Sequence, residues 1–129
     1  MLSGQMQVMF DNLPTCAEHV KSGKLRGLAI TSTTRSDVLP DLPPVADFLP
    51  GYEASAWYGL AAPKGTPPEI VDRLNKAVNE ILADPKAKAR FTEIGAILLP
   101  GSAADFGKLV ADETVKWGKV VKFAGAKVD

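Results

Sequence analysis

The sequence predicts an α/β fold in which short parallel strands are followed by amphipathic helices. Two short apolar runs, at residues 6–10 and 25–30, flank a stretch with the pattern of a short helix. A strand–helix–strand order of this kind places the two strands parallel in one sheet. After a proline-rich stretch, the apolar residues from Thr66 onward recur with the period of a helix.

The composition is that of an ordinary globular chain. The 129 residues are 46% hydrophobic and 23% charged, and fifteen basic residues balance fifteen acidic ones. Nucleic-acid binding is not expected, because such proteins carry a basic excess or stripe. One cysteine allows neither an internal disulfide nor a cysteine zinc cluster. No apolar run reaches the about 18–20 residues of a membrane span, and the first residues lack the basic and apolar regions of a secretory signal. We therefore expect a soluble protein.

The first third of the chain predicts one βαβ unit. Residues 6–10 form an uninterrupted apolar run that is typical of a strand buried on both faces. Thr15 and Glu18 have the spacing of a capping box and predict a short helix that ends near Gly23. Residues 25–30 form the second buried strand.

Proline then interrupts every period between residues 35 and 53, which predicts an extended or turn-rich connector with a short helical turn at residues 45–47. Residues 56–62 are a third strand candidate, stopped by Pro63. Residues 96–99 are a fourth.

Three helices are expected in the remainder. The first begins at the capping box of Thr66 and Glu69, with proline at the first helical position. The second begins at Asp84, runs to about Ile94 and is closed by a glycine. A final helix is capped by Ser102 with Asp105.

Two polar clusters fall at the carboxyl ends of the two parallel strands. Phe10, Asp11 and Asn12 close the first strand, and Thr31 and Ser32 begin the cluster that closes the second. Ligands of open parallel sheets bind at this edge. The alternative, which the residues leave open, is that both clusters only form turns. The charge of Asp11 suits an ammonium, a hydroxyl or a bridging water better than direct contact with an anion.

The other candidate residues have a structural and a functional interpretation. Cys16 and His19 share one face of the short helix, as a metal pair or an activated thiolate requires, yet two ligands are too few for a metal site. Trp57 and Tyr58 on the third strand can form a cleft wall or belong to a core. We find no motif of a catalytic triad or a metalloenzyme, so no catalytic or metal-binding residue is assigned.

Several runs occur in a familiar order along the whole chain. They are GQMQVMFDNLP at residues 4–14, KSGKLRGLAITS at 21–32, LPDLP at 39–43, PGYE at 50–53, WYGLAAP at 57–63, GTP at 65–67 and WGKVV at 117–121. Together they resemble the extracytoplasmic solute receptors of tripartite tricarboxylate transporters, the Bug or TctC-like family.

The resemblance implies a periplasmic binding protein with two α/β lobes, of the type 2 kind, that delivers a small carboxylate to a membrane permease and needs no cofactor. The ligand expected is a dicarboxylate, a citrate-like acid, an amino acid or an aromatic acid. The implied ligand-binding residues are Phe10, Asp11, Asn12, Thr31, Ser32, Trp57 and Tyr58.

Family members are about twice this length or more, so the chain is expected to correspond to their C-terminal part. The implied division is a partial second lobe over residues 1–34, a crossing between lobes over 35–55, and helices that pack on the first lobe over 56–129. Because apolar helix faces then lack their cover, we expect a dimer or higher oligomer that buries Leu74, Val78, Leu109 and Trp117. Two alternatives remain: a non-binding segment that only oligomerises, and, more remotely, an enzyme using Cys16 and His19.

Overall fold

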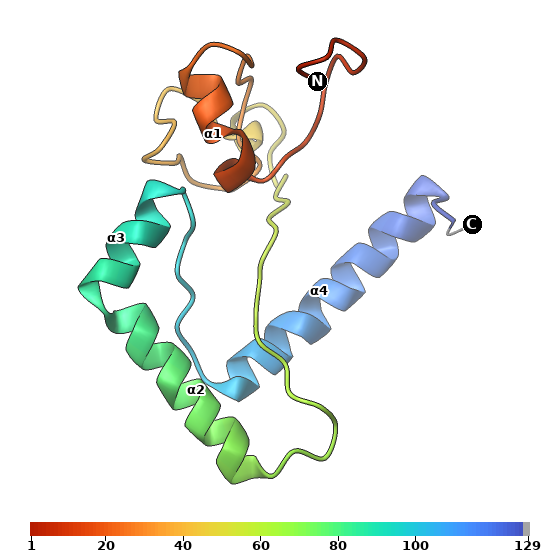
Figure 1. The fold of residues 1–129 in the computed structure, drawn as a ribbon. Helices are drawn as coiled ribbons and strands as arrows, with labels where there is room; N and C mark the ends of the chain where they lie inside the picture. Colours follow the sequence, from red (N-terminus) through yellow and green to blue (C-terminus); the bar gives the residue numbers. More distant parts are fainter. Residues whose placement is uncertain (128–129) are drawn as a thin grey trace. The chain divides into compact units, whose positions relative to one another are not determined.

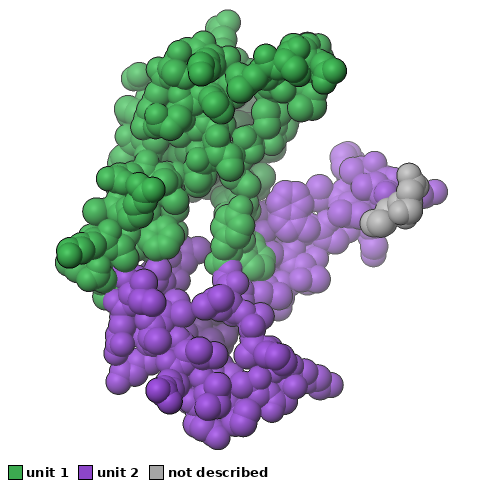
Figure 2. Space-filling view, viewed as in Figure 1, with its two compact units in different colours: residues 1–58, 83–98 green, residues 59–82, 99–129 purple. Residues whose placement is uncertain are grey.

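The computed structural model describes residues 1–127, and this part of the chain is helical with extended connections (Figure 1). Its elements are α1 (Leu13–Lys21), the short 3-10 helix η1 (Val45–Asp47), α2 (Pro68–Ala83), α3 (Pro85–Glu93) and α4 (Ala103–Ala124). The chain divides into two compact units, of which unit 1 comprises Met1–Tyr58 and Ala83–Leu98, and unit 2 comprises Gly59–Leu82 and Leu99–Asp129 (Figure 2).

Two of the three helix starts predicted in the C-terminal half are confirmed, and the third differs. Helix α2 begins at Pro68 rather than Pro67, and the Thr66 hydroxyl donates to the Pro63 carbonyl at 2.8 Å. Asp84 accepts hydrogen bonds from the backbone N–H groups of Lys86 and Ala87, both at 2.9 Å, and so begins α3. Ser102 and Asp105 form the predicted reciprocal capping box of α4. Side chains within three residues of the helix start satisfy these N–H groups, which is why the short sequence pattern predicts them.

The start of α1 differs from the prediction. The helix begins at Leu13 with Asn12 as its N-cap residue, whereas Thr15 donates its hydroxyl to the Asn12 carbonyl at 2.7 Å. The Asn12 side chain makes no capping hydrogen bond. Thr15 with Glu18 is therefore not a capping box, because Pro14 already fits the first turn of a helix that starts earlier.

The four predicted strands are not formed within residues 1–127, which is a correction to the predicted βαβ unit. Residues 6–10, 56–62 and 96–99 are extended or irregular, and only Ile30 of the second run takes part in a bridge, which is parallel and pairs it with Pro44. An extended segment becomes a strand only when a neighbour accepts and donates its backbone hydrogen bonds. The first run is also exposed rather than buried, with Phe10 at 79% of its full exposure.

The proline-rich stretch of unit 1 packs along the predicted second strand. Ile30 donates its backbone N–H to the Pro43 carbonyl at 2.9 Å, and Val45 donates to the Ile30 carbonyl at 2.8 Å. Further along, Ala54 donates to the Thr31 carbonyl at 3.1 Å. The connector is therefore tied at two places to residues 30–31, and η1 confirms the helical turn predicted within it.

The small core of unit 1 gathers around α1. Ala17 of α1 and Leu39 and Pro44 of the connector are its buried apolar residues among those described. Gly27 lies so close to the connector that an added Cβ would come within 2.7 Å of Leu42. At the end of α3, a Cβ on Gly95 would collide with Leu13.

In unit 2, asparagines of α2 hold the chain just before α4. Asn79 binds the backbone of Gly101 at both of its polar groups, accepting from its N–H at 3.1 Å and donating to its carbonyl at 2.9 Å. Asn75 donates to the same carbonyl at 2.9 Å. A Cβ on Gly59 would collide with the ring of Phe106, so residue 59 lies against the first turn of α4. None of the described helices is long and apolar enough to cross a membrane.

Candidate functional site

Two predicted site residues from distant parts of unit 1 meet in the structure. The side-chain amide of Asn12 donates a hydrogen bond to the Tyr58 hydroxyl oxygen at 3.2 Å, across 46 residues of sequence. Both side chains are exposed, Tyr58 at 84%. Their polar groups therefore do not satisfy a buried core, and they remain accessible to a ligand.

The residues before Asn12 complete a polar turn. Asp11 accepts a hydrogen bond from the backbone N–H of Asn12 at 2.9 Å, so it orders the entry to α1. Phe10 is exposed beside it. This hydrogen bond agrees with the interpretation of Asp11 as a turn former. It involves only one of the two carboxylate oxygens of Asp11.

The second polar cluster is organised differently. The backbone carbonyl of Thr31 accepts from Ala54, and the Ser32 hydroxyl donates to the Thr34 carbonyl at 2.8 Å. Both residues are half-buried. In the part of the chain that the structure describes, no hydrogen bond joins either residue to Asn12 or Tyr58. Ser32 behaves as a turn former, and its role in a ligand site stays a prediction. Trp57, next to Tyr58, is half-buried.

Cys16 does not have the environment of a nucleophile. Its thiol lies 3.9 Å from the Leu13 carbonyl, and no hydrogen bond to His19 is found among residues 1–127. Burial raises the pKa of the Cys16 thiol, and the negative charge of Asp11 raises it further, against the lowering effect of a backbone hydrogen bond. A thiol activated for attack needs the opposite shift. No group of three potential metal ligands occurs within the described residues either.

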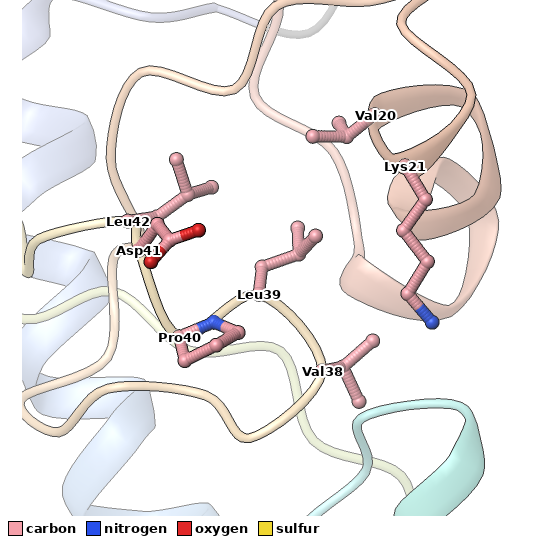
Figure 3. A pocket seen from close by; sticks show the side chains of 7 residues that line it. All are labelled: Val20, Lys21, Val38, Leu39, Pro40, Asp41 and Leu42. Carbon is pink, nitrogen blue, oxygen red and sulfur yellow. The ribbon is translucent and has the colours of Figure 1, made fainter.

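A shallow hollow of about 290 Å³ lies on unit 1, and none of the predicted site residues lines it (Figure 3). It is lined by Val20 and Lys21 of α1 and by residues 38–42 of the connector. Its lining is mainly aliphatic, and Lys21 at its edge is paired with Glu18 at 3.3 Å. Sequence analysis did not single out this hollow, since LPDLP by itself shows only a turn. Without convergent polar groups it offers little to hold a charged ligand.

Comparison with known proteins agrees with the resemblance seen in the sequence. Residues 1–126 match the family described as "Tripartite tricarboxylate transporter family receptor". Protein BugT of Bordetella pertussis is 36% identical over 129 residues, which are 99% of this chain and 40% of BugT.

Solved structures of similar proteins share the fold of this chain. Rpa4515 of R. palustris, solved with adipate, superposes with a TM-score of 0.88 at 38% identity, over 96% of this chain and 42% of that one. The periplasmic binding protein BugD superposes with a TM-score of 0.79 at 36% identity, over 87% of this chain and 38% of that one.

These matches confirm the predicted fold class, because this chain superposes on part of periplasmic binding proteins. The chain thus spans about two-fifths of the length of these relatives. The family is one of substrate-binding receptors rather than of enzymes. The chain belongs to the tripartite tricarboxylate transporter receptor family.

Proposed function

We propose that this chain contributes one wall of a carboxylate-binding site in a periplasmic receptor, with Asp11, Asn12 and Tyr58 as its central residues. The observation that carries the proposal is the exposed hydrogen bond from the Asn12 amide to the Tyr58 hydroxyl oxygen. Because that oxygen accepts from Asn12, the hydroxyl proton of Tyr58 is free to be donated to another acceptor. A ligand carboxylate is such an acceptor.

Family membership supports the ligand class. The receptors of this family serve a tricarboxylate transporter, and the similar protein Rpa4515 was solved with adipate. Phe10, Thr31, Ser32 and Trp57 are proposed as further contributors, from the resemblance. The proposed partners are a small carboxylate and a membrane permease, and the proposed location is the periplasm.

The test uses a chimera in which the part of BugT that this chain does not match is joined to residues 1–129. Calorimetric titration with adipate, citrate, aspartate and benzoate identifies the ligand that binds. Asn12→Ala and Tyr58→Phe are then compared with Ser55→Ala, a change at an exposed hydroxyl near Tyr58. A hydrogen bond to a charged group is worth about 1.5–3 kcal/mol, so each site variant should weaken binding roughly 10-fold to 150-fold.

Two results contradict the proposal. One is that no carboxylate binds a folded chimera. The other is that Asn12→Ala and Tyr58→Phe each lose less than about 0.5 kcal/mol, well below a hydrogen bond to a charged group. Asn12 and Tyr58 then only fasten the start of α1 to the extended segment.

A second function is favoured by the exposed apolar residues of α2 and α4. Leu74 is 51% exposed and Trp117 39%. Apolar surface of this kind is typical of an interaction face. We propose that the chain self-associates through these helices, and a 129-residue chain that stays monomeric in sedimentation equilibrium would contradict this.

A further inference from the structure

Two asparagines on one side of α2 bind the chain just before it enters α4. The side-chain amide of Asn79 binds both backbone groups of Gly101, accepting from the N–H at 3.1 Å and donating to the carbonyl at 2.9 Å. Asn75, one turn earlier, donates to the same carbonyl at 2.9 Å. A carboxamide carries its acceptor and its donor side by side, so one side chain can bind both groups of a residue as a neighbouring strand does. We call Asn75, Asn79 and Gly101 the asparagine clamp.

The orientation of the Asn79 amide is fixed by its own helix. Its nitrogen also donates to the backbone carbonyl of Asn75 at 3.0 Å and to the Asn75 side-chain oxygen at 3.2 Å. A reversed amide would set its oxygen against these acceptors and against the Gly101 carbonyl. Asparagine is a weak helix former, so two of them inside α2 cost helix stability that alanine would not. Their bonds to Gly101 are what the two side chains contribute in return.

The asparagine clamp is joined directly to the start of α4. The residue after Gly101 is Ser102, the N-cap residue, whose backbone N–H donates to the Asp105 carboxylate at 2.8 Å. A Cβ on Gly101 would lie 3.3 Å from an oxygen of that carboxylate, so residue 101 lies close to the cap. Because the clamp and the cap are on consecutive residues, the clamp fixes where α4 begins relative to α2.

Apolar packing adds little at this point of unit 2. Among residues 59–82 and 99–127, the described part of that unit, no residue is buried. Leu74 of α2 is 51% exposed, and Leu99, two residues before Gly101, is 67% exposed. The two hydrogen bonds between Asn79 and Gly101 are exposed as well. A contact made of exposed hydrogen bonds opens at much lower cost than a buried core, because water replaces the bonds.

We propose that the asparagine clamp is a releasable strap, which sets the direction of α4 on α2 and opens without unfolding either helix. When the side-chain amides leave Gly101, both helices keep their backbone hydrogen bonds and α4 keeps its capping box, since none of these involves Asn75 or Asn79 side chains. The open state leaves α4 free to change its direction relative to α2. The proposal involves no ligand, so it stands or falls separately from the carboxylate site.

Hydrogen exchange of the 129-residue chain, followed residue by residue by NMR, tests the clamp itself. After correction for intrinsic rates, the Gly101 N–H should exchange at least tenfold more slowly than the Leu99 N–H, for which no hydrogen bond is found within residues 1–127. Asn79→Ala should bring the two rates within about twofold of each other and leave the protection inside α2 and α4 unchanged. Lys76→Ala, at an exposed position of the same helix, is the control and should leave the Gly101 rate unchanged.

Distances between spin labels test whether the clamp sets the direction of α4. In a Cys16→Ser background, labelled cysteines replace Arg73 of α2 and Lys119 of α4, which are both exposed. The distance distribution should become at least about twice as wide when Asn79→Ala is added and should keep its width when Lys76→Ala is added. Circular dichroism should show the same helix content in all three chains.

Three results overturn the proposal. The first is a wild-type Gly101 N–H that exchanges as fast as the Leu99 N–H, because the clamp is then not closed in solution. The second is an Asn79→Ala chain with the distance distribution of its parent, because the clamp then does not set the direction of α4. The third is a loss of helix content or of helix protection in Asn79→Ala, because the clamp is then part of the folding of the helices rather than a strap between them.

Discussion

Asn12 occupies the N-cap position of α1, yet its side chain is bonded to Tyr58 rather than to the helix. The amide nitrogen donates to the Tyr58 hydroxyl oxygen at 3.2 Å, and no hydrogen bond from the asparagine side chain caps α1. An asparagine at this position ordinarily caps the helix and stabilises it by about 1 kcal/mol. Here that interaction is given up in favour of a contact 46 residues away, which joins the two segments of the proposed carboxylate site.

The charge of Asp11 should select among carboxylic acids. In the chimera with BugT, Asp11→Asn is expected to weaken the binding of an amino acid about tenfold or more. The ammonium group of the ligand loses a hydrogen bond to a charged partner, which is worth about 1.5–3 kcal/mol. The same change should leave the affinity for adipate unchanged or increase it, because the negative charge that repels the dicarboxylate is removed. Calorimetry with aspartate and adipate measures both. Equal losses for the two ligands would show that Asp11 acts only through the turn.

Cys16 should react slowly with thiol reagents. Burial and the neighbouring Asp11 raise the pKa of its thiol, so less thiolate is present at neutral pH than for a free cysteine. The rate of alkylation by iodoacetamide, followed from pH 6 to 10, should have its midpoint above that of N-acetylcysteine amide. Asp11→Asn should move the midpoint down but not to the free value, because burial, the larger cause, is unchanged. A midpoint at or below the free thiol would contradict the raised pKa.

Gly95 and Gly23 form a matched pair for testing the packing of unit 1. Both have positive φ, +74° and +72°, but only at Gly95 would an added Cβ collide with a neighbour, Leu13. Gly23→Ala should cost roughly 1–2 kcal/mol from backbone strain alone. Gly95→Ala should cost roughly 2–4 kcal/mol, because overpacking is added to the same strain. Urea unfolding measures both, and adding Leu13→Ala to Gly95→Ala should recover part of the difference. Equal costs would mean that the end of α3 does not pack on α1.

The cap of α4 should make the chain sensitive to acid. Hydrogen bonds from Ser102 lower the pKa of the Asp105 carboxyl below its ordinary 3.8. A group whose pKa is lower in the folded state stabilises that state above its unfolded pKa, and this stabilisation is lost as the pH falls through the folded value. Ser102→Ala should cost about 1 kcal/mol at pH 7.

The Ser102→Ala variant should lose less stability than the wild type between pH 4 and pH 2. The variant removes the hydroxyl hydrogen bond, which is the larger cause of the lowered Asp105 pKa, and keeps only the bond from the backbone N–H of residue 102. Urea midpoints at the three pH values measure this, with Ser55→Ala as the control. A parallel acid dependence in wild type and Ser102→Ala would show that Asp105 does not contribute through the cap.

The helices of this protein were largely predictable from the sequence, whereas its pairings were not. Asp84 and Ser102 cap their helices through groups two or three residues away, so the whole interaction lies inside a short sequence window. The run at residues 6–10 has the composition of a buried strand, but composition cannot supply the neighbour that a strand requires. Among the described residues of the second run, Ile30 alone forms a bridge, and its partner is Pro44 of the connector.

The site shows the same division. The sequence pointed to Asn12 and Tyr58 separately, Asn12 at the end of an apolar run and Tyr58 on a strand candidate that could form a cleft wall or belong to a core. The family resemblance implied both. The folded structure adds that the two side chains bond to each other and that the Asn12 side chain does not cap its helix. The difference arises from the distance along the chain between the interacting groups. A cap depends on backbone groups that the helix itself always provides, whereas a contact across 46 residues depends on how the chain folds back between them.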